Sequence, residues 1–199
     1  MEIRPMTPAD IPRAASTLAD AFLDDPFTVW LFPADGLRER LLRSWTMQLR
    51  VLSVPRGSAF ATPDLGGIAL WAPPSSPPPT LRQQLRLFFP FVRILGRRLP
   101  TAMSGFRVIR RGHPSEPHWY LSTIGVAPER QRSGYGRALM GPILERADRE
   151  QTITYLETFK LDNVPYYERF GFRVTGEDDV PDAGPHMWSM TRLPFAGGG

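Results

Sequence analysis

The sequence has 199 residues, 42% of them hydrophobic, a net charge of +4 and no cysteine. This length and apolar content predict one soluble domain with a substantial core. Without cysteine, disulfides, thiolate metal ligands and a cysteine nucleophile are excluded, and three scattered histidines are too few for a metal site. Nucleic-acid-binding motifs, a membrane-spanning run and a signal-like apolar segment are all missing, so we expect a cytoplasmic protein without a nucleic-acid or membrane partner.

The N-terminal part of the chain predicts a strand, two helices and a hairpin, in that order. Thr7 is a candidate N-cap because its hydroxyl can accept a hydrogen bond at the start of a helix. Two glycines between the later strands favour a tight turn. The expected elements are a strand at residues 1–7, helices at 7–26 and 37–52, and paired strands at 57–62 and 67–73.

A proline- and serine-rich segment at residues 72–79 separates this hairpin from a basic, aromatic and amphipathic stretch. We expect a loop there rather than a domain linker, followed by inserted helices at about residues 80–112 with a break at Pro90. A stretch of this composition can also bind a membrane surface. The interrupting proline favours packing in the core or against a substrate instead.

The C-terminal half has a more regular pattern. Apolar residues at Leu139, Ile143 and Ala147 recur at the spacing of the buried face of a helix, and Gly171 stands where a helix C-cap favours glycine. The expected elements are a strand at 118–126, a helix at 136–150, a strand at 152–159, a short helix at 163–170 and a strand at 186–192. This order is typical of a βαβ unit that binds a ligand at the ends of its strands.

The loop between the strand at 118–126 and its helix has the composition of a phosphate-binding site. A helix N-terminus presents unpaired N–H groups and the positive end of the helix dipole. Gly134 and Gly136 leave space for phosphate oxygens. Two flanking arginines, Arg132 and Arg137, can add charge-assisted contacts, as can Arg130. Because the Walker lysine and the third dinucleotide-fingerprint glycine are both missing, we expect another pyrophosphate-bearing ligand, with an ordinary glycine turn as the alternative.

Two motifs resemble the GNAT superfamily of acetyltransferases. The loop at 131–136, Q-x-x-G-x-G, is similar to the acetyl-coenzyme A motif of that superfamily. The segment at 163–172 contains the asparagine, tyrosine and Gly-Phe pair of its second motif, at the expected distance. Within the superfamily, four segments resemble the puromycin N-acetyltransferases and their actinobacterial relatives: "EPHWYLSTIGV", "YLETF", "NVPYYERFGF" and "GPHMWSMTR".

The resemblance implies an α/β GNAT fold, with a mixed, mostly antiparallel sheet that splays between its fourth and fifth strands. Helices would cover both faces, and the helical insertion would follow the third strand. One domain would span residues 1–199, with the acetyl-CoA-binding and catalytic half at 118–175, and a substrate amine would attack the thioester directly. The residues that the resemblance assigns to acetyl-CoA are Ile124, Gly125 and Val126 for the pantetheine arm, Gln131, Arg132, Ser133, Gly134, Tyr135, Gly136 and Arg137 for the pyrophosphate, and Asn163.

Attack by an amine requires one group that removes its proton and another that protonates the departing thiolate. In GNAT enzymes the tyrosine at the position of Tyr167 commonly protonates the thiolate; a core tyrosine bonded to a backbone carbonyl is the alternative. Asn163 as N-cap and Pro165 in the first turn would hold its helix. Glu157 is the candidate base, because an acid among apolar strand residues is costly unless paired or used. The alternatives are an arginine-paired Glu157, a weaker base at His118, or a water chain.

The acceptor amine has candidate partners in the N-terminal half. Asp25 follows the first predicted helix next to Phe27 and Trp30, where an acid beside aromatic rings can hold a cation; solvation of a helix end explains the acid equally well. Tyr120 lies on the strand that faces the same site. We expect acetylation of a primary amine of a small molecule, such as an aminonucleoside or another antibiotic, by a monomer or homodimer. A protein or peptide N-acetyltransferase and a non-catalytic acyl-CoA sensor are the alternatives.

Overall fold

One mixed sheet organises the protein in the computed structural model, which describes residues 1–195. The strands are β1 (Arg4–Pro5), β2 (Ala59–Ala61), β3 (Gly67–Ala72), β4 (His118–Val126), β5 (Ile153–Thr158), β6 (Arg173–Asp179) and β7 (His186–Arg192). Their order in the sheet is β1-β2-β3-β4-β5-β7-β6. All neighbours are antiparallel except β4 and β5, which are parallel. The end of the predicted domain, 196–199, lies outside the described residues.

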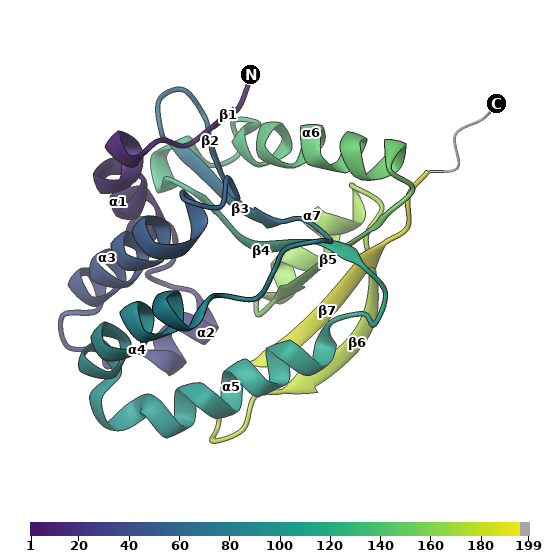
Figure 1. Ribbon diagram of the computed structural model, residues 1–199. Helices are drawn as coiled ribbons and strands as arrows, with labels where there is room; N and C mark the ends of the chain where they lie inside the picture. Colours follow the sequence, from purple (N-terminus) through teal and green to yellow (C-terminus); the bar gives the residue numbers. More distant parts are fainter. Residues whose placement is uncertain (196–199) are drawn as a thin grey trace.

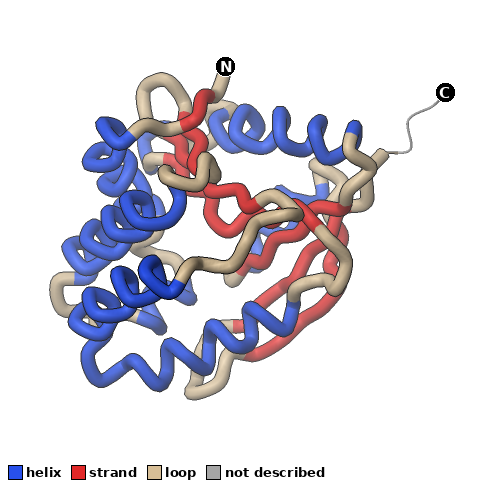
Figure 2. Tube along the Cα trace, viewed as in Figure 1, coloured by secondary structure: helices blue, strands red, loops and turns tan. Residues whose placement is uncertain are grey.

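Helices cover both faces of this sheet (Figure 1). They are α1 (Ile11–Ala21), α2 (Pro26–Leu31), α3 (Leu37–Gln48), α4 (Leu81–Leu95), α5 (Leu99–Gly112), α6 (Tyr135–Arg149) and α7 (Val164–Glu168). The helix α6 lies on one side, whereas α1 and α3 lie on the other, where α4 and α5 extend the helical layer (Figure 2). Within the described part of the chain, no helix has the length and apolar content needed to cross a bilayer.

The alternation of side chains along β3 builds the core on both sides of the sheet. Ile68 and Leu70 pack with α1 on one face, whereas Ala69 and Trp71 pack with α6 on the other. The Trp71 indole is fully buried, and its Nε1 donates to the carbonyl of Leu139 in α6 at 3.3 Å. Successive residues of a strand point to opposite faces. The continuously apolar sequence of β3 therefore packs against helices on both faces of the sheet.

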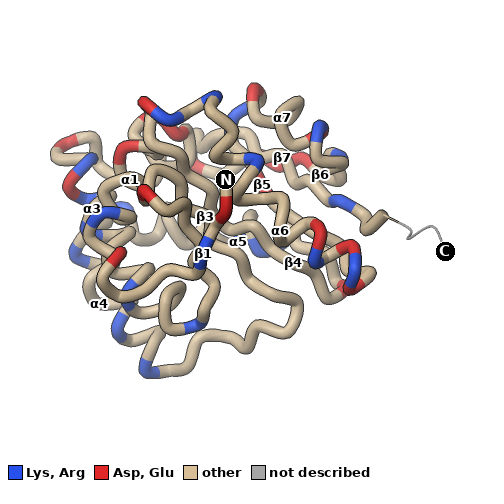
Figure 3. Tube along the Cα trace, turned by 90° about the horizontal axis from the view of Figure 1, so that it is seen from above, with Lys and Arg blue, Asp and Glu red and all other residues tan. Residues whose placement is uncertain are grey.

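Charged residues of both signs are interspersed over α1 and α3 (Figure 3). Arg38 on α3 pairs through Nε with Asp20 Oδ1 on α1 at 2.7 Å, and its NH2 donates to Ser16 Oγ at 3.0 Å. The side chains of this ion pair are 50% and 33% exposed, so water screens most of their attraction. Apolar packing of α1 and α3 therefore contributes more to their association than this pair does.

Several predicted elements match the structure closely. The strands at 118–126 and 186–192 are β4 and β7, and the helix at 136–150 corresponds to α6. Two elements escaped prediction. No helix was predicted at α2, which begins at Pro26, where the predicted first helix ends; that first helix stops earlier, at Ala21. The strand β6 is exposed along most of its length, so its charged sequence carries no apolar alternation; pairing with β7 makes it a strand.

The predicted break at Pro90 is wrong. Pro90 lies inside α4, which continues to Leu95 and ends at Gly96, where φ is +55°. A proline in a helix removes one backbone donor and crowds the preceding turn. Pro90 is exposed, so water can hydrogen-bond the carbonyl that lost its partner. The glycine with a left-handed φ ends the helix instead.

The strands β4 and β5 separate partway along their length. Their parallel pairing runs only from His118 opposite Ile153 to Leu121 opposite Leu156. Beyond that point β4 continues to Val126 beside β3, whereas the last residues of β5 pair with β7. This separation confirms the expected GNAT sheet, which opens between its fourth and fifth strands and leaves backbone groups of β4 without a partner strand on that side.

Candidate active site

The loop before α6 presents unpaired backbone amides at a helix N-terminus. Gly134 is the N-cap of α6 and has a left-handed φ of +83°. The first helical hydrogen bond runs from the amide of Ala138 to the carbonyl of Gly134 at 3.0 Å. The amides of the residues between them therefore have no acceptor within the helix. Together with the positive end of the helix dipole, they form a site that favours a phosphate group.

The two glycines of this loop are required for different reasons. At Gly134 an added Cβ would meet no heavy atom within 4 Å, but the left-handed φ disfavours other residues. At Gly136 an added Cβ would lie 2.1 Å from the hydroxyl oxygen of Tyr166 on α7. Glycine at position 136 therefore lets α7 pack against the start of α6. This reason differs from the predicted approach of a phosphate oxygen.

Most side chains of the loop point to solvent. Arg132, Ser133 and Arg137 are exposed, and within residues 1–195 neither of these arginines forms a salt bridge. Both guanidinium groups can therefore reach an anion at the loop. Gln131 is exposed as well, and its Nε2 donates to the carbonyl of Val126 on β4 at 3.4 Å.

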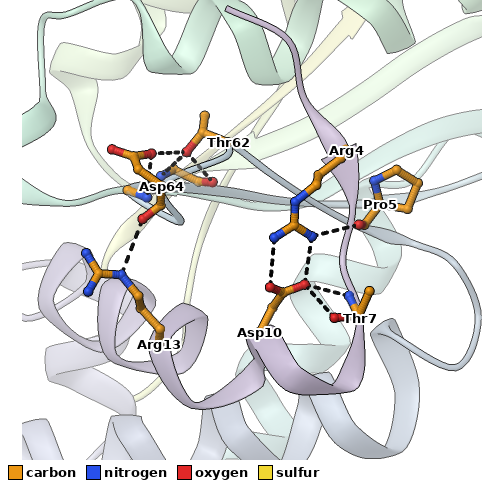
Figure 4. A network of polar contacts seen from close by, with 9 residues as sticks. Arg4, Pro5, Thr7, Asp10, Arg13, Thr62 and Asp64 are labelled. Carbon is orange, nitrogen blue, oxygen red and sulfur yellow. Dashed lines mark hydrogen bonds and ion pairs between the residues drawn. The ribbon is translucent and has the colours of Figure 1, made fainter.

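Tyr135 is buried and contributes its amide, rather than its side chain, to the loop. Its hydroxyl donates to Asp64 Oδ2 at 2.7 Å, the main reason why the pKa of Asp64 falls to about 2. The other oxygen of Asp64 accepts from the Thr62 hydroxyl at 2.8 Å and from the Gly66 amide at 3.1 Å (Figure 4). Arg130 Nε lies 3.6 Å from the same carboxylate. Asp64, which sequence reasoning did not single out, thus ties the β2–β3 turn to the start of α6.

The backbone of β4 faces the gap beside β5 at alternate residues. The amide of Ala127 donates to the carbonyl of Gly66 on the β3 side, at 2.8 Å. Because backbone groups of successive strand residues point to opposite neighbours, those of Val126 and Ile124 point toward the gap. The backbone groups of Gly125 point toward β3, and a side chain there would collide with α1. Of the three predicted pantetheine residues, two therefore present hydrogen-bonding groups to the gap.

A cavity of about 300 Å³ lies where β4 and β5 separate. It is bounded by α2, α3, α4 and α5 together with β4, β5 and α7. The predicted site residues that line it are Asp25, Phe27, Tyr120, Ile124, Glu157, Asn163 and Tyr167. Trp30 is not among its lining residues: the indole packs against Gly105 and donates from Nε1 to the carbonyl of Asp182 at 3.1 Å.

Glu157 and Tyr120 form a buried hydrogen-bonded pair on the cavity wall. The Tyr120 hydroxyl donates to Glu157 Oε1 at 2.6 Å. Glu157 Oε2 is buried and has no hydrogen-bond partner in the described part of the chain, a costly arrangement for a charged oxygen. Burial raises the pKa of Glu157 to about 8, and burial beside Glu157 raises that of Tyr120 as well. No arginine neutralises Glu157 among the described residues, in contrast to the arginine-paired alternative.

Tyr167 is held in the cavity wall by α7. Its side chain is 6% exposed, and its hydroxyl has no hydrogen-bond partner among residues 1–195. Burial, and then the fields of Tyr166, Glu157 and Asp25, raise the pKa of Tyr167, so its hydroxyl keeps its proton at neutral pH. Pro165 occupies the first turn of α7, as predicted.

Asn163 does not cap α7 with its side chain, in contrast to the prediction. Its Nδ2 donates to the hydroxyl of Thr158 at 3.1 Å, which links the end of β5 to the start of α7. A short 3-10 turn, Leu161–Asn163, precedes the helix and leaves Asn163 with a helical backbone. An N-cap side chain normally requires an extended backbone at that position. The hydrogen bond with Thr158 therefore holds α7 in place.

Asp25 is the N-cap of α2. Its Oδ1 accepts from the Thr28 amide at 2.9 Å, and Pro26 follows in the first turn. Burial is the main reason why the pKa of Asp25 is raised. The Asp-Pro pair is a helix-start signal that was present in the sequence. Asp25 therefore has a structural role as well as a place on the cavity wall.

Aromatic side chains that sequence reasoning missed complete the cavity. Phe27 stacks on Phe159, which follows β5, with ring centroids 4.5 Å apart. Phe106 on α5 lies 6.0 Å from Phe27 and also 6.0 Å from Phe91 on α4. Trp45 adds a further ring from α3. No local pattern connects these residues, because they meet only when the inserted helices fold over α2.

His118, the weaker candidate for a base, lies away from the cavity lining. Its Nε2 is 3.0 Å from His113 Nδ1, and its Nδ1 is 2.7 Å from the carbonyl of Glu116. Burial, followed by the charge of His118, lowers the pKa of His113 to about 4. The His113 ring packs against the ring of Tyr120, with centroids 4.4 Å apart, but neither histidine lines the cavity.

Comparisons with known proteins agree with this geometry. The model of the acetyltransferase (GNAT) family matches residues 68–172. An uncharacterized N-acetyltransferase of Schizosaccharomyces pombe is 30% identical over 182 residues, which are 82% of this chain and 70% of the relative. A structure from Corynebacterium glutamicum, described as histone acetyltransferase HPA2 and related acetyltransferase, is 26% identical with a TM-score of 0.72, covering 98% of this chain and 97% of that one.

A more distant structure shares the fold. Drosophila melanogaster polyamine N-acetyltransferase is 14% identical with a TM-score of 0.62, and the match covers 96% of this chain and 98% of that one. The family match begins in β3 and ends just after α7, so it includes both the glycine loop and the segment that carries Tyr167. The chain therefore belongs to the GNAT family and is an N-acetyltransferase.

Proposed function

We propose that this protein transfers an acetyl group from acetyl-CoA directly to a primary amine of a small molecule. The observation that carries the proposal is the cavity of about 300 Å³ at the β4–β5 gap, lined by both Glu157 and Tyr167. One of these groups can accept a proton and the other can donate one. The unpaired amides of α6 follow the end of β4, so an extended acetyl donor can reach from that loop to the cavity.

The residues around the gap suit acetyl-CoA. The amides at the start of α6, with Arg132 and Arg137, would hold its pyrophosphate. The backbone groups of Ile124 and Val126 would hold the pantetheine arm in place of a partner strand. When bound, acetyl-CoA supplies the thioester that carries the transferred group. The polar loop thus suits the pyrophosphate of acetyl-CoA, and the open edge of β4 suits its pantetheine arm.

Two side chains would handle the protons. Glu157 takes one proton from the acceptor ammonium, and the amine nitrogen can then bond to the thioester carbonyl carbon. Tyr167 donates its phenolic proton to the sulfur as the carbon–sulfur bond breaks. The second proton lost by the nitrogen balances the one that Tyr167 gives up, so the net products are an amide, a thiol and one released proton.

The enclosure of the cavity favours small acceptors. The inserted helices α4 and α5 contribute Phe91, Phe106 and Ile109 to its wall, which leaves little room for an extended peptide. The resemblance to puromycin N-acetyltransferases adds aminonucleosides and other antibiotics to the candidate acceptors. The fold also occurs in an enzyme that catalyses the formation of N-acetylagmatine and in Chaetomium thermophilum Naa20, solved with a bisubstrate analogue, so the fold does not define the acceptor.

The direct test is acetyl-CoA consumption with a panel of amines: aminonucleosides including puromycin, aminoglycosides, polyamines, arylalkylamines and short peptides. We expect turnover with at least one small-molecule amine and formation of its amide, identified by mass spectrometry. Turnover confined to peptides would make the protein a peptide N-acetyltransferase and overturn the proposal. Tight acetyl-CoA binding without turnover of any amine would instead indicate a sensor.

Replacing Glu157 with glutamine should remove an inflection from the pH–rate profile. Because burial raises the pKa of Glu157 to about 8, the carboxylate that accepts the proton forms only as pH rises through that value. The parent kcat/KM should therefore climb through about pH 8. In E157Q it should be about 10- to 100-fold lower at pH 9, with a smaller difference at pH 6, where the parent residue is protonated too.

The pH dependence of the stability provides a second test of the raised pKa of Glu157. A carboxyl whose folded pKa lies above its unfolded value binds its proton more tightly in the folded state, so parent stability should fall as pH rises from about 4.5 to 8. E157Q does not lose stability in this way, so its Tm should exceed that of the parent by about 10 °C or more at pH 9 but match it at pH 4. Tyr120→Phe is the matched control. The hydrogen bond from the Tyr120 hydroxyl lowers the pKa of Glu157, so in this variant the inflection of the pH–rate profile should move to a higher pH. Identical pH–rate profiles of E157Q and the parent would exclude Glu157 as the base.

A further inference from the structure

We propose that the acceptor is an arylalkylamine without a carboxylate, whose ammonium group binds between Asp25 and Glu157 while its ring packs among the phenylalanines of the cavity. This inference rests on the proposed function and narrows its substrate class. It follows from the ionisable groups and the aromatic rings that line the cavity.

The ionisable side chains of the cavity, apart from tyrosine, are carboxyl groups only. Its lining in the described structure contains two carboxyl side chains, Asp25 and Glu157, and no lysine, arginine or histidine. Both carboxyl groups line the same cavity as Tyr167, which would protonate the thiol. An acceptor with its own carboxylate would bury that charge without a partner, at a cost that binding cannot recover. Free amino acids are therefore poor candidates.

The rest of the wall is apolar and aromatic. Phe27 and Phe159 stack with an interplanar angle of 19°, and Phe106 meets the edge of Phe27 at 65°. Such rings favour offset or edge contacts with another aromatic ring and also attract an adjacent ammonium. A polyamine would cover these rings with methylene groups and would gain no contact between rings. The wall therefore favours an acceptor that carries an aromatic ring close to its amine.

Asp25→Asn tests the ammonium site. Asparagine caps helices as well as aspartate does, so the variant keeps the hydrogen bond from the Thr28 amide that begins α2 and removes only the charge. We expect the KM for 2-phenylethylamine to rise about tenfold or more, with the acetyl-CoA dissociation constant unchanged and a Tm no lower than that of the parent, because burial raises the pKa of Asp25. Asp24→Asn is the matched control, because Asp24 is 81% exposed, pairs with Lys160 and lies outside the cavity lining. Equal effects of the two substitutions would overturn the ammonium site.

Phe106→Ala tests the aromatic wall. Phe106 is 38% exposed, so its truncation should leave the fold intact, yet it removes a ring that touches both Phe27 and Phe91. We expect kcat/KM for 2-phenylethylamine to fall about tenfold and that for butylamine to change by less than about twofold. Phe89→Ala on α4, where the ring is 65% exposed and outside the lining, should change neither. A uniform loss for both amines in Phe106→Ala would argue against ring recognition.

The decisive comparison uses the parent protein and four amines: 2-phenylethylamine, phenylalanine, butylamine and spermidine. We expect kcat/KM for 2-phenylethylamine to exceed that for phenylalanine and spermidine about 100-fold or more, because phenylalanine adds a carboxylate without a cationic partner and spermidine has no ring to pack against the wall. Preferred turnover of spermidine or phenylalanine would overturn the arylalkylamine class and leave the N-acetyltransferase proposal standing. Failure to acetylate any amine of the wider panel, despite acetyl-CoA binding, would overturn both.

Discussion

Tyr167→Phe should lower kcat about 100-fold or more, with little change in acetyl-CoA affinity or in the free energy of unfolding. The substitution removes only the hydroxyl, and that hydroxyl donates to no group among residues 1–195. The substitution therefore breaks no hydrogen bond of the folded protein. The buried ring keeps its packing against the ring of Phe172, with centroids 6.1 Å apart. The raised pKa of Tyr167 keeps the hydroxyl protonated over the working range of pH, as a proton donor to the thiolate requires. Steady-state and single-turnover kinetics on the purified variant measure the effect.

Tyr166→Phe is the matched control for this experiment. Tyr166 precedes Tyr167 on the same helix, but its hydroxyl lies against Gly136 at the start of α6 rather than in the cavity lining. Its removal should therefore affect acetyl-CoA affinity more than the chemical step. Parent-like turnover in Tyr167→Phe, with chemistry shown to limit the rate, would rule out Tyr167 as the general acid.

Gly134→Val should weaken acetyl-CoA binding about 100-fold or more, with the effect measured by calorimetry. The φ of +83° at Gly134 turns the chain into α6, and a β-branched residue is a strong outlier there. The backbone would have to leave this conformation, which would misdirect the amides of Tyr135, Gly136 and Arg137. Because an added Cβ would meet no atom within 4 Å, the loss would come from the backbone rather than from a collision.

Two further variants separate the backbone effect from a general loss of stability. Gly134→Asn should weaken binding less than Gly134→Val, because asparagine tolerates the left-handed region. Gly141→Val places the same side chain later in α6, where φ is ordinary and an added Cβ meets open space; acetyl-CoA affinity should stay at the parent value. If Gly134→Val folds and binds acetyl-CoA as the parent does, the loop does not hold the pyrophosphate.

The sequence by itself determined the elements whose patterns are local. The strand β4, the strand β7 and the helix α6 were predicted nearly to the residue, because burial of one face imposes a period that can be counted along the chain. The glycine loop that begins α6 was also predictable, since the helix start and its glycines are neighbours in sequence. The resemblance of the two motifs then led to the GNAT fold, which the family match bears out.

Only the tertiary structure decided the rest. The strand β6 has no buried face of its own and exists because β7 pairs with it, and α4 passes through Pro90 because that side of the helix is open to water. The need for glycine at 136 comes from Tyr166, a residue of another helix. Asp25, Glu157 and Tyr167 each carry a separate local signal, but their meeting in one cavity depends on α2 through α5 folding over the gap between β4 and β5. Contacts between residues far apart in sequence leave no period to count, so the shape and the charge of the acceptor cavity are properties of the folded chain alone.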